Sequence, residues 1–382
     1  MLSIHRKSGL SLALALLLAV TLVMSVDGRA AGHGETRIDG EIAGTPYTLL
    51  QPDTWNGDLV LLVHGSIPND FEALAPGFTA QGYGVAFVTL TNIVGDGDDD
   101  AYREVTLATR KVQAKFTARF GQPNRTYLFG FSRGAHNMTR LVETSSARYD
   151  GMLSICGANG GTQQQLDYFF TARVLFDYYF PGVLPGSPLE MPPLDFNGFF
   201  STVAPLVINA VLQNPLAAAE MAAVDQYGLQ YNDFGELVSG ILQSLIIHSV
   251  TVNGTLDAAR GNPFDNSATG YTGTSNDAAL NAGIARLVAD PQARAYAATW
   301  YEPSGSIGGT PVILLHTSRD PIVPDSPGND KYEALVEASG NGDFLLRRTI
   351  DRFGHCEVTP DEIFGSFAEL VGWAETGVRP PQ

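Results

Sequence analysis

Ser132 stands in a pentapeptide whose spacing suits nucleophilic catalysis. Residues 130–134 read Gly-Phe-Ser-Arg-Gly, after an apolar run at 127–129 and before a stretch with helical apolar spacing. Glycines two positions either side of the serine permit a turn too tight for larger residues. The serine would then lie at a helix N-terminus, where backbone N–H groups face a developing negative charge. The same pattern also fits a glycine-rich turn whose serine has no catalytic role. Whether Ser132 is a nucleophile therefore depends on whether the chain also supplies a base and an acid.

A serine hydroxyl needs a histidine base, and the histidine needs an acid that holds its tautomer. Asp320 follows the apolar run 310–316 in a loop stiffened by prolines, and His355 follows the run 344–350. Catalytic groups of open α/β sheets lie beyond the carboxyl ends of strands, and both residues have that position. We therefore predict a triad of Ser132, Asp320 and His355.

Other acids and histidines are alternatives. Asp351 lies too near His355 in the chain to be its acid, and Asp325 is further past its strand than Asp320. Each remaining candidate base has a structural interpretation. His136, one helical turn after the serine, is expected to pack or to cap the helix. His316 is expected to line the sheet. His248 is expected to be a hydrogen-bonded residue within an apolar helix.

Two backbone donors are needed to hold the oxyanion. The N–H of Arg133, directly after the nucleophile, is the first candidate. The second is the N–H of Ser66, or of Ile67 beside it, after the strand that ends in His64-Gly65. The Arg133 side chain is expected to pair with a carboxylate, with a grip on an anionic substrate as the alternative.

Alternating strand and helix patterns predict a parallel α/β sheet. Continuous apolar runs are typical of strands buried on both faces. The predicted strands are 46–51, 58–63, 85–90, 127–129, 151–156, 310–316 and 344–350, and helical periodicity covers 102–120, the stretch after Ser132, 331–338 and the C-terminus. The last helix has a capping box, with Thr359 as N-cap, Pro360, Glu362 three residues on, and Gly377 at its end.

The alternation stops between residues 157 and 306. Aromatic residues crowd 167–181, prolines follow to 193, and 237–250 and 277–298 have helical patterns. We predict a mostly helical insertion over the sheet. The aromatic residues are interpreted as the insertion's own core, with a binding surface as the alternative.

The composition of the chain limits the classes of partner that it can bind. The net charge of −17 argues against nucleic acid or an anionic membrane as a partner. Basic residues followed by the apolar run 10–26, with small residues before 31, predict a secretory signal peptide over 1–30, with an uncleaved anchor as the alternative. We expect no later apolar stretch to be long enough to cross a bilayer. Four acids in 96–100 fit a solvated loop or, alternatively, a calcium loop.

These motifs resemble the α/β-hydrolase superfamily over about 40–157 and 306–380. The resemblance rests on His64-Gly65, residues 130–134, Asp320-Pro321 with Val323-Pro324, and Gly354-His355. It implies an α/β-hydrolase fold with a mostly parallel eight-stranded sheet and a lid inserted after strand six. The expected division is a core over 31–157 and 306–382 and a lid over 158–305. It also implies ester hydrolysis through an acyl-enzyme, without cofactor or metal.

The dipeptide His355-Cys356 is similar to the tannase and feruloyl esterase group. There, a cysteine after the catalytic histidine forms a disulfide with one before the serine, a position held here by Phe131. Cys156, at the end of the neighbouring strand, is the expected replacement. The resemblance thus suggests a Cys156–Cys356 disulfide, with two buried thiols as the alternative.

The resulting hypothesis is a secreted or periplasmic serine esterase for apolar or aromatic esters or polyester oligomers. A peptidase with the same triad is the alternative, although Glu220 and Glu236 are not convincingly paired as a terminus-binding group. The third hypothesis is a non-catalytic binding module that keeps the same fold.

Overall fold

The computed structural model describes residues 34–42, 44–63, 70–89 and 101–382. The predicted signal peptide, the acidic loop 96–100 and the loop with Ser66 lie outside this described part of the chain.

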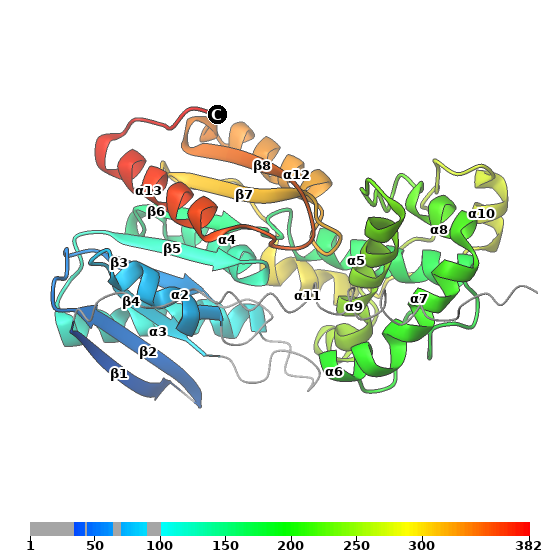
Figure 1. Ribbon diagram of the computed structural model, residues 1–382, viewed down its shortest axis with the longest axis horizontal. Helices are drawn as coiled ribbons and strands as arrows, with labels where there is room; N and C mark the ends of the chain where they lie inside the picture. The colour runs from blue at the N-terminus through cyan, green and yellow to red at the C-terminus, as the bar shows by residue number, and fades with distance from the viewer. Residues whose placement is uncertain (1–33, 43, 64–69, 90–100) are drawn as a thin grey trace, which may run out of the picture.

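One eight-stranded sheet organises the fold, in the order β1-β2-β4-β3-β5-β6-β7-β8 (Figure 1). β2 pairs antiparallel with β1 and β4, and the other neighbours run parallel. The strands are β1 Glu35–Ile42, β2 Thr45–Pro52, β3 Leu59–Val63, β4 Gly84–Val88, β5 Thr126–Phe131, β6 Gly151–Ile155, β7 Val312–Arg319 and β8 Leu345–Phe353. The predicted fold class, a mostly parallel eight-stranded sheet, is confirmed.

Helices cover both faces of the sheet because its central strands are apolar on both sides. Alternate residues of β3 enter two separate cores: Leu61 packs with α3 (Ala101–Phe120), α4 (Arg133–Ser145) and α12 (Asp325–Ala338). Leu62 packs with α2 (Asp70–Thr79) and α13 (Pro360–Thr376) on the opposite face. This layering holds the strand ends in fixed positions.

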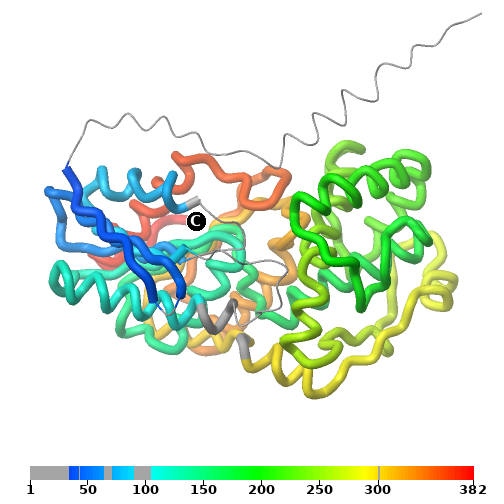
Figure 2. The backbone as a smooth tube through the Cα atoms, turned by 90° about the horizontal axis from the view of Figure 1, so that it is seen from below, coloured from blue at the N-terminus to red at the C-terminus, as the bar shows by residue number. Residues whose placement is uncertain are grey.

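Between β6 and β7 the chain forms a helical block beside the sheet (Figures 1 and 2). Its elements are α5 Thr162–Tyr179, α6 Phe196–Gly198, η2 Phe199–Val203, α7 Ala204–Gln213, α8 Pro215–Ala222, α9 Phe234–Ala259, α10 Asp277–Gly283 and α11 Pro291–Tyr301. The block has its own core, in which Phe170, Phe176 and Phe199 are almost fully buried. The aromatic residues of 167–181 therefore serve mainly the block's interior, as the first interpretation held.

The single helix expected over 277–298 is wrong. Residues 284–290 are not helical, and α11 begins only at Pro291. Side chains from a preceding loop hold this break: Asn266 accepts from the N–H of Leu287 at 2.7 Å, and Asn262 donates to the carbonyl of Val288 at 2.9 Å. Backbone groups so satisfied have no need of helical partners.

Two described stretches, 196–213 and 234–259, are long and apolar enough to cross a membrane by length and composition, contrary to expectation. In α9, 67% of the apolar window is buried, which is typical of a core helix in a soluble protein. In 196–213 only 28% is buried, and a stripe with helical spacing faces the block's core: Phe199, Val203, Val207 and Val211.

The predicted capping box at the start of α13 is present and can be tested. Thr359 Oγ1 accepts from the N–H of Glu362 at 3.3 Å, and Glu362 Oε2 accepts from the N–H of Thr359 at 2.7 Å. We expect Thr359→Ala to lower the free energy of unfolding by about 1 kcal/mol in urea titrations, because one N-terminal donor loses its partner. Thr202→Ala, at an exposed site in the block, is the control and should change stability by less than about 0.5 kcal/mol. Equal effects of the two changes would contradict the role of the cap.

Candidate active site

Ser132 occupies the turn between β5 and α4. Its backbone has φ 52° and ψ −123°, a strained conformation for a residue with a side chain. The turn is possible because position 130 is glycine: a Cβ there would lie 2.9 Å from the carbonyl oxygen of Val63 and 3.1 Å from the backbone of Gly134. A strained serine at the first turn of a helix is the geometry of a nucleophile elbow.

The structure brings the three residues of the predicted triad together. His355 Nε2 lies 2.9 Å from Ser132 Oγ, and His355 Nδ1 lies 2.7 Å from Asp320 Oδ2. The serine follows β5, the acid follows β7 and the histidine follows β8, so all three stand at one edge of the sheet. An acceptor at Nδ1 holds the imidazole with its hydrogen there, which leaves Nε2 to accept the serine proton.

The Asp320 carboxylate is fully buried, and both of its oxygen atoms accept hydrogen bonds. Its side chain has 0% exposure, and Oδ1 accepts the N–H groups of Ile322 and Val323 at 2.9 Å each. Burial alone would raise the pKa of Asp320. The charge of His355 and hydrogen bonds from His316 and His355 outweigh burial and lower that pKa to about 2. The Asp320 carboxyl group is therefore ionised at neutral pH.

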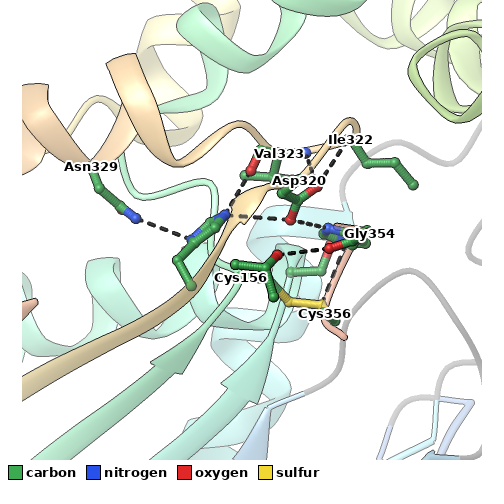
Figure 3. Close-up of a disulfide and its surroundings, with 11 residues drawn as sticks. Cys156, Asp320, Ile322, Val323, Asn329, Gly354 and Cys356 are labelled. Atoms are coloured by element: carbon green, nitrogen blue, oxygen red, sulfur yellow. Dashed lines mark hydrogen bonds and ion pairs between the residues drawn. A yellow bond between two sulfur atoms is a disulfide. The ribbon is translucent and has the colours of Figure 1, made fainter. Parts of the chain in front are cut away.

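The loop that carries His355 is fixed by three contacts, of which Figure 3 shows the disulfide between Cys156 and Cys356. Thr317 Oγ1 donates to the carbonyl of Gly354 at 2.7 Å, and the N–H of Gly354 donates to the carbonyl of Arg319 at 3.0 Å. Gly354 has φ +109°, which only glycine adopts readily. The third contact is a Cys156–Cys356 disulfide, which ties this loop to the end of β6 with 5.2 Å between the two Cα atoms. The expected pairing is thus present.

The helical block contacts the loop that carries the acid. Tyr168 Oη donates to the carbonyl of Pro321 at 2.8 Å, and Gln165 Nε2 donates to the carbonyl of Ile322 at 2.9 Å, both from α5. Glu236 of α9 pairs with Arg319 at 3.1 Å. The block is therefore bonded to the residues on either side of Asp320.

The alternative acids are engaged elsewhere. Asp351 pairs with Arg319 and its side chain is 86% exposed. Asp325 accepts from Asn329 at 2.7 Å and pairs with Arg347 at 3.0 Å. Glu220 and Glu236, considered for a peptide terminus, do not contact each other in any interaction of the described residues: Glu220 accepts from the N–H of Ser275.

Two of the alternative histidines are buried structural residues. His136 Nδ1 lies 2.7 Å from the carbonyl of Ala158, and His248 Nε2 lies 2.9 Å from that of Pro188. Burial lowers the pKa of His136 to about 4 and that of His248 to about 3. The third, His316, was expected only to line the sheet, but it also reaches the triad, with Nε2 3.4 Å from Asp320 Oδ2. Its position four residues before the acid is the signal that sequence reasoning passed over.

The oxyanion hole stays a prediction. Arg133 is the first residue of α4, so its N–H lies at the start of that helix, whereas Ser66 is outside the described residues. Cys156, His355 and Cys356 place possible ligand atoms within 4.8 Å of one another. The two sulfur atoms are bonded to each other and so do not act as thiolate ligands.

The disulfide generates a prediction for stability. Replacing both Cys156 and Cys356 by serine should lower the free energy of unfolding by about 2–4 kcal/mol, because the unfolded chain loses a constraint. Urea titrations with and without a reductant measure this change. Reductant should destabilise the wild-type protein and leave the double variant unaffected. A double variant as stable as the oxidised wild type would contradict the prediction.

No protein-family model matches the chain, and no curated protein matches its sequence. Solved structures are similar in fold. Feruloyl esterase B from Aspergillus oryzae has 14% sequence identity and a TM-score of 0.50, covering 91% of this chain and 81% of that one, and a second structure, an esterase from Aspergillus oryzae, gives the same values. An esterase from Pyrococcus furiosus has 13% identity and a TM-score of 0.45, with 89% and 91% of the two chains covered. The strand order, the strained serine turn and the likeness to the Aspergillus structures lead to one conclusion: this chain has the α/β-hydrolase fold.

Proposed function

We propose that this protein is a serine hydrolase that cleaves carboxylic esters through an acyl-enzyme. The observation that carries the proposal is the continuous line from Ser132 Oγ through His355 to the buried carboxylate of Asp320, with distances of 2.9 and 2.7 Å. A strained serine in hydrogen-bond contact with an oriented base is the arrangement of an activated nucleophile.

In the proposed reaction Ser132 Oγ attacks the ester carbonyl carbon while His355 Nε2 takes the hydroxyl proton. Asp320 stabilises the imidazolium that forms, without taking its proton. The tetrahedral intermediate expels the alcohol, which receives the proton from His355. Water, activated by His355, then attacks the acyl-enzyme and releases the acid. The N–H of Arg133, together with that of Ser66, is proposed to hold the oxyanion in both steps.

We propose apolar esters as the substrate class, including aromatic esters and polyester oligomers. The aromatic residues of α5 give little support, because most are buried in the block. Support comes instead from Phe131 and Ile322, apolar residues next to the nucleophile and near the acid, both only partly buried. Two such side chains favour an apolar group in the bound ester, but they do not select one particular ester.

The activity is tested with p-nitrophenyl esters of graded acyl length. Wild-type protein should release p-nitrophenol, and Ser132→Ala should lower kcat by about 10⁴-fold or more, because the triad acts as a unit. Ser201→Ala, at an exposed serine of the helical block, is the matched control and should retain full activity. A fluorophosphonate probe should label wild-type protein and not the Ser132 variant.

Wild-type protein that neither turns over esters nor reacts with the probe would refute the hydrolase proposal. Turnover of peptides in preference to esters would replace the esterase by the peptidase alternative.

We further propose that the protein works outside the cytoplasm, in an oxidising compartment. Its disulfide supports this location, since such bonds persist where thiols are not kept reduced. Expression with residues 1–30 intact in a bacterial host should yield exported protein whose N-terminal sequencing begins at Ala31. Protein that keeps Met1 and stays in the cytoplasm would contradict this proposal.

A further inference from the structure

A second histidine contacts the catalytic acid from within the sheet. His316, on β7, has a side chain with 1% exposure. Its Nε2 lies 2.7 Å from the carbonyl oxygen of Val323 and 3.4 Å from Asp320 Oδ2. A carbonyl oxygen only accepts hydrogen bonds, so Nε2 carries a hydrogen. That N–H bonds the Val323 carbonyl and also lies near the carboxylate oxygen that receives His355 Nδ1, with 3.4 Å between Nε2 and Asp320 Oδ2.

The ring of His316 is held in this orientation by partners at both of its nitrogen atoms. Asn329 Nδ2 lies 3.1 Å from His316 Nδ1 and 2.7 Å from Asp325 Oδ1. The carboxylate of Asp325 accepts only, which identifies this amide atom as the donor. Asn329 Oδ1 in turn accepts from Asn159 Nδ2 at 2.9 Å. Each member of this buried chain has a partner, so the ring has one favoured orientation.

Two carboxylates act on His316, one from the loop after its own strand and one from α12. Asp320 lies beyond its own strand, and Asp325 belongs to α12, where Arg347 of β8 partly neutralises it. Burial alone would lower the pKa of His316, but the hydrogen bond to Asp320 and the charges of Asp320 and Asp325 raise it. The position of the hydrogen follows from the geometry: Nδ1 accepts from Asn329 Nδ2, so the hydrogen of the neutral ring lies at Nε2.

We propose that His316 is a positioning residue for the triad, whose Nε2–H fixes Asp320 Oδ2 against His355. This inference rests on the proposed esterase function and deepens it. Three N–H groups then bond the acid, two from its own turn and one from His355, and the Nε2–H of His316 lies beside Oδ2 at 3.4 Å as a fourth contact. His316 touches no substrate atom and acts only through Asp320.

The hydrogen bond also limits how strongly Asp320 stabilises a protonated His355. An N–H on Oδ2 draws negative charge away from the oxygen that faces His355. Without it, protonated His355 is stabilised more and the base form of the triad appears only at higher pH. A merely structural histidine would not have this effect, so the pH profile separates the two roles.

The test compares His316→Phe, which keeps a ring and removes the donor, with His316→Gln, which keeps an amide donor. We measure kcat, KM and the pH profile of kcat/KM with a p-nitrophenyl ester. His316→Phe should lower kcat by about 10- to 100-fold with KM changed by less than about twofold, because the defect is in orientation. The acid limb of its profile should move to higher pH, and His316→Gln should recover part of both effects.

His248→Phe is the matched control, because it also removes a fully buried histidine whose Nε2 contacts a backbone carbonyl, but far in sequence from the triad. Its acid limb should coincide with that of the wild type. If His316→Phe does not fold, as judged by circular dichroism, Asn329→Ala carries the test. That change removes the amide that orients the ring, and should shift the acid limb in the same direction.

Suppose that the wild type is active but His316→Phe, or Asn329→Ala where that variant is used, has an unshifted acid limb and an unchanged kcat. This result would overturn the inference about His316 and leave the proposed function standing. Loss of activity equal to that of His248→Phe, without a shift, would also overturn that inference. A wild type that is inert toward both esters and the fluorophosphonate probe would overturn the proposed function and this inference with it.

Discussion

A buried negative charge on Asp320 is the constraint on which the rest of the site depends. A carboxylate without access to water is very costly unless it is paired and hydrogen-bonded. Here the partners come from three places: the turn that follows β7, His355 beyond β8, and His316 within β7. Helix α5 in turn bonds the backbone of that turn. The sheet matters because it brings these elements to one edge. A shift of any of them would leave the charge less well compensated, so stability and geometry of the site are linked.

The helical block contributes to the same arrangement. Its core is separate from the cores of the sheet, yet Tyr168 and Gln165 bond the carbonyl groups that follow Asp320. The few polar side chains of α5, a largely apolar helix, thus stabilise the loop that carries Asp320. A movement of the block would pull on this loop through Tyr168 and Gln165, and also on α4, where Thr162 Oγ1 of the block lies 3.1 Å from His136 Nε2.

Much of this arrangement could be predicted from the sequence because it depends on local signals. The strained turn at Ser132 needs glycine at 130, and α13 begins where Thr359 and Glu362 form their box. Helix α5 was missed for a physical reason: every residue from 168 to 176 is buried, so the segment lacks the polar face that reveals a helix. The break at 284–290 depends on asparagine side chains about 20 residues away, which no local pattern reveals. His316 lines the sheet as expected, but its contact with Asp320 was not foreseen, because a spacing of four residues does not tell a contact with an acid from ordinary packing.

The disulfide has a topological consequence. Cys156 and Cys356 are 200 positions apart, and the covalent ring that they close contains the whole helical block, β7 and β8. A protease that cuts one exposed loop of the block, such as 267–270, would open this ring without separating the polypeptide into two molecules. The fragment with the serine and the fragment with the histidine would stay joined beside the site, and they would come apart only after reduction.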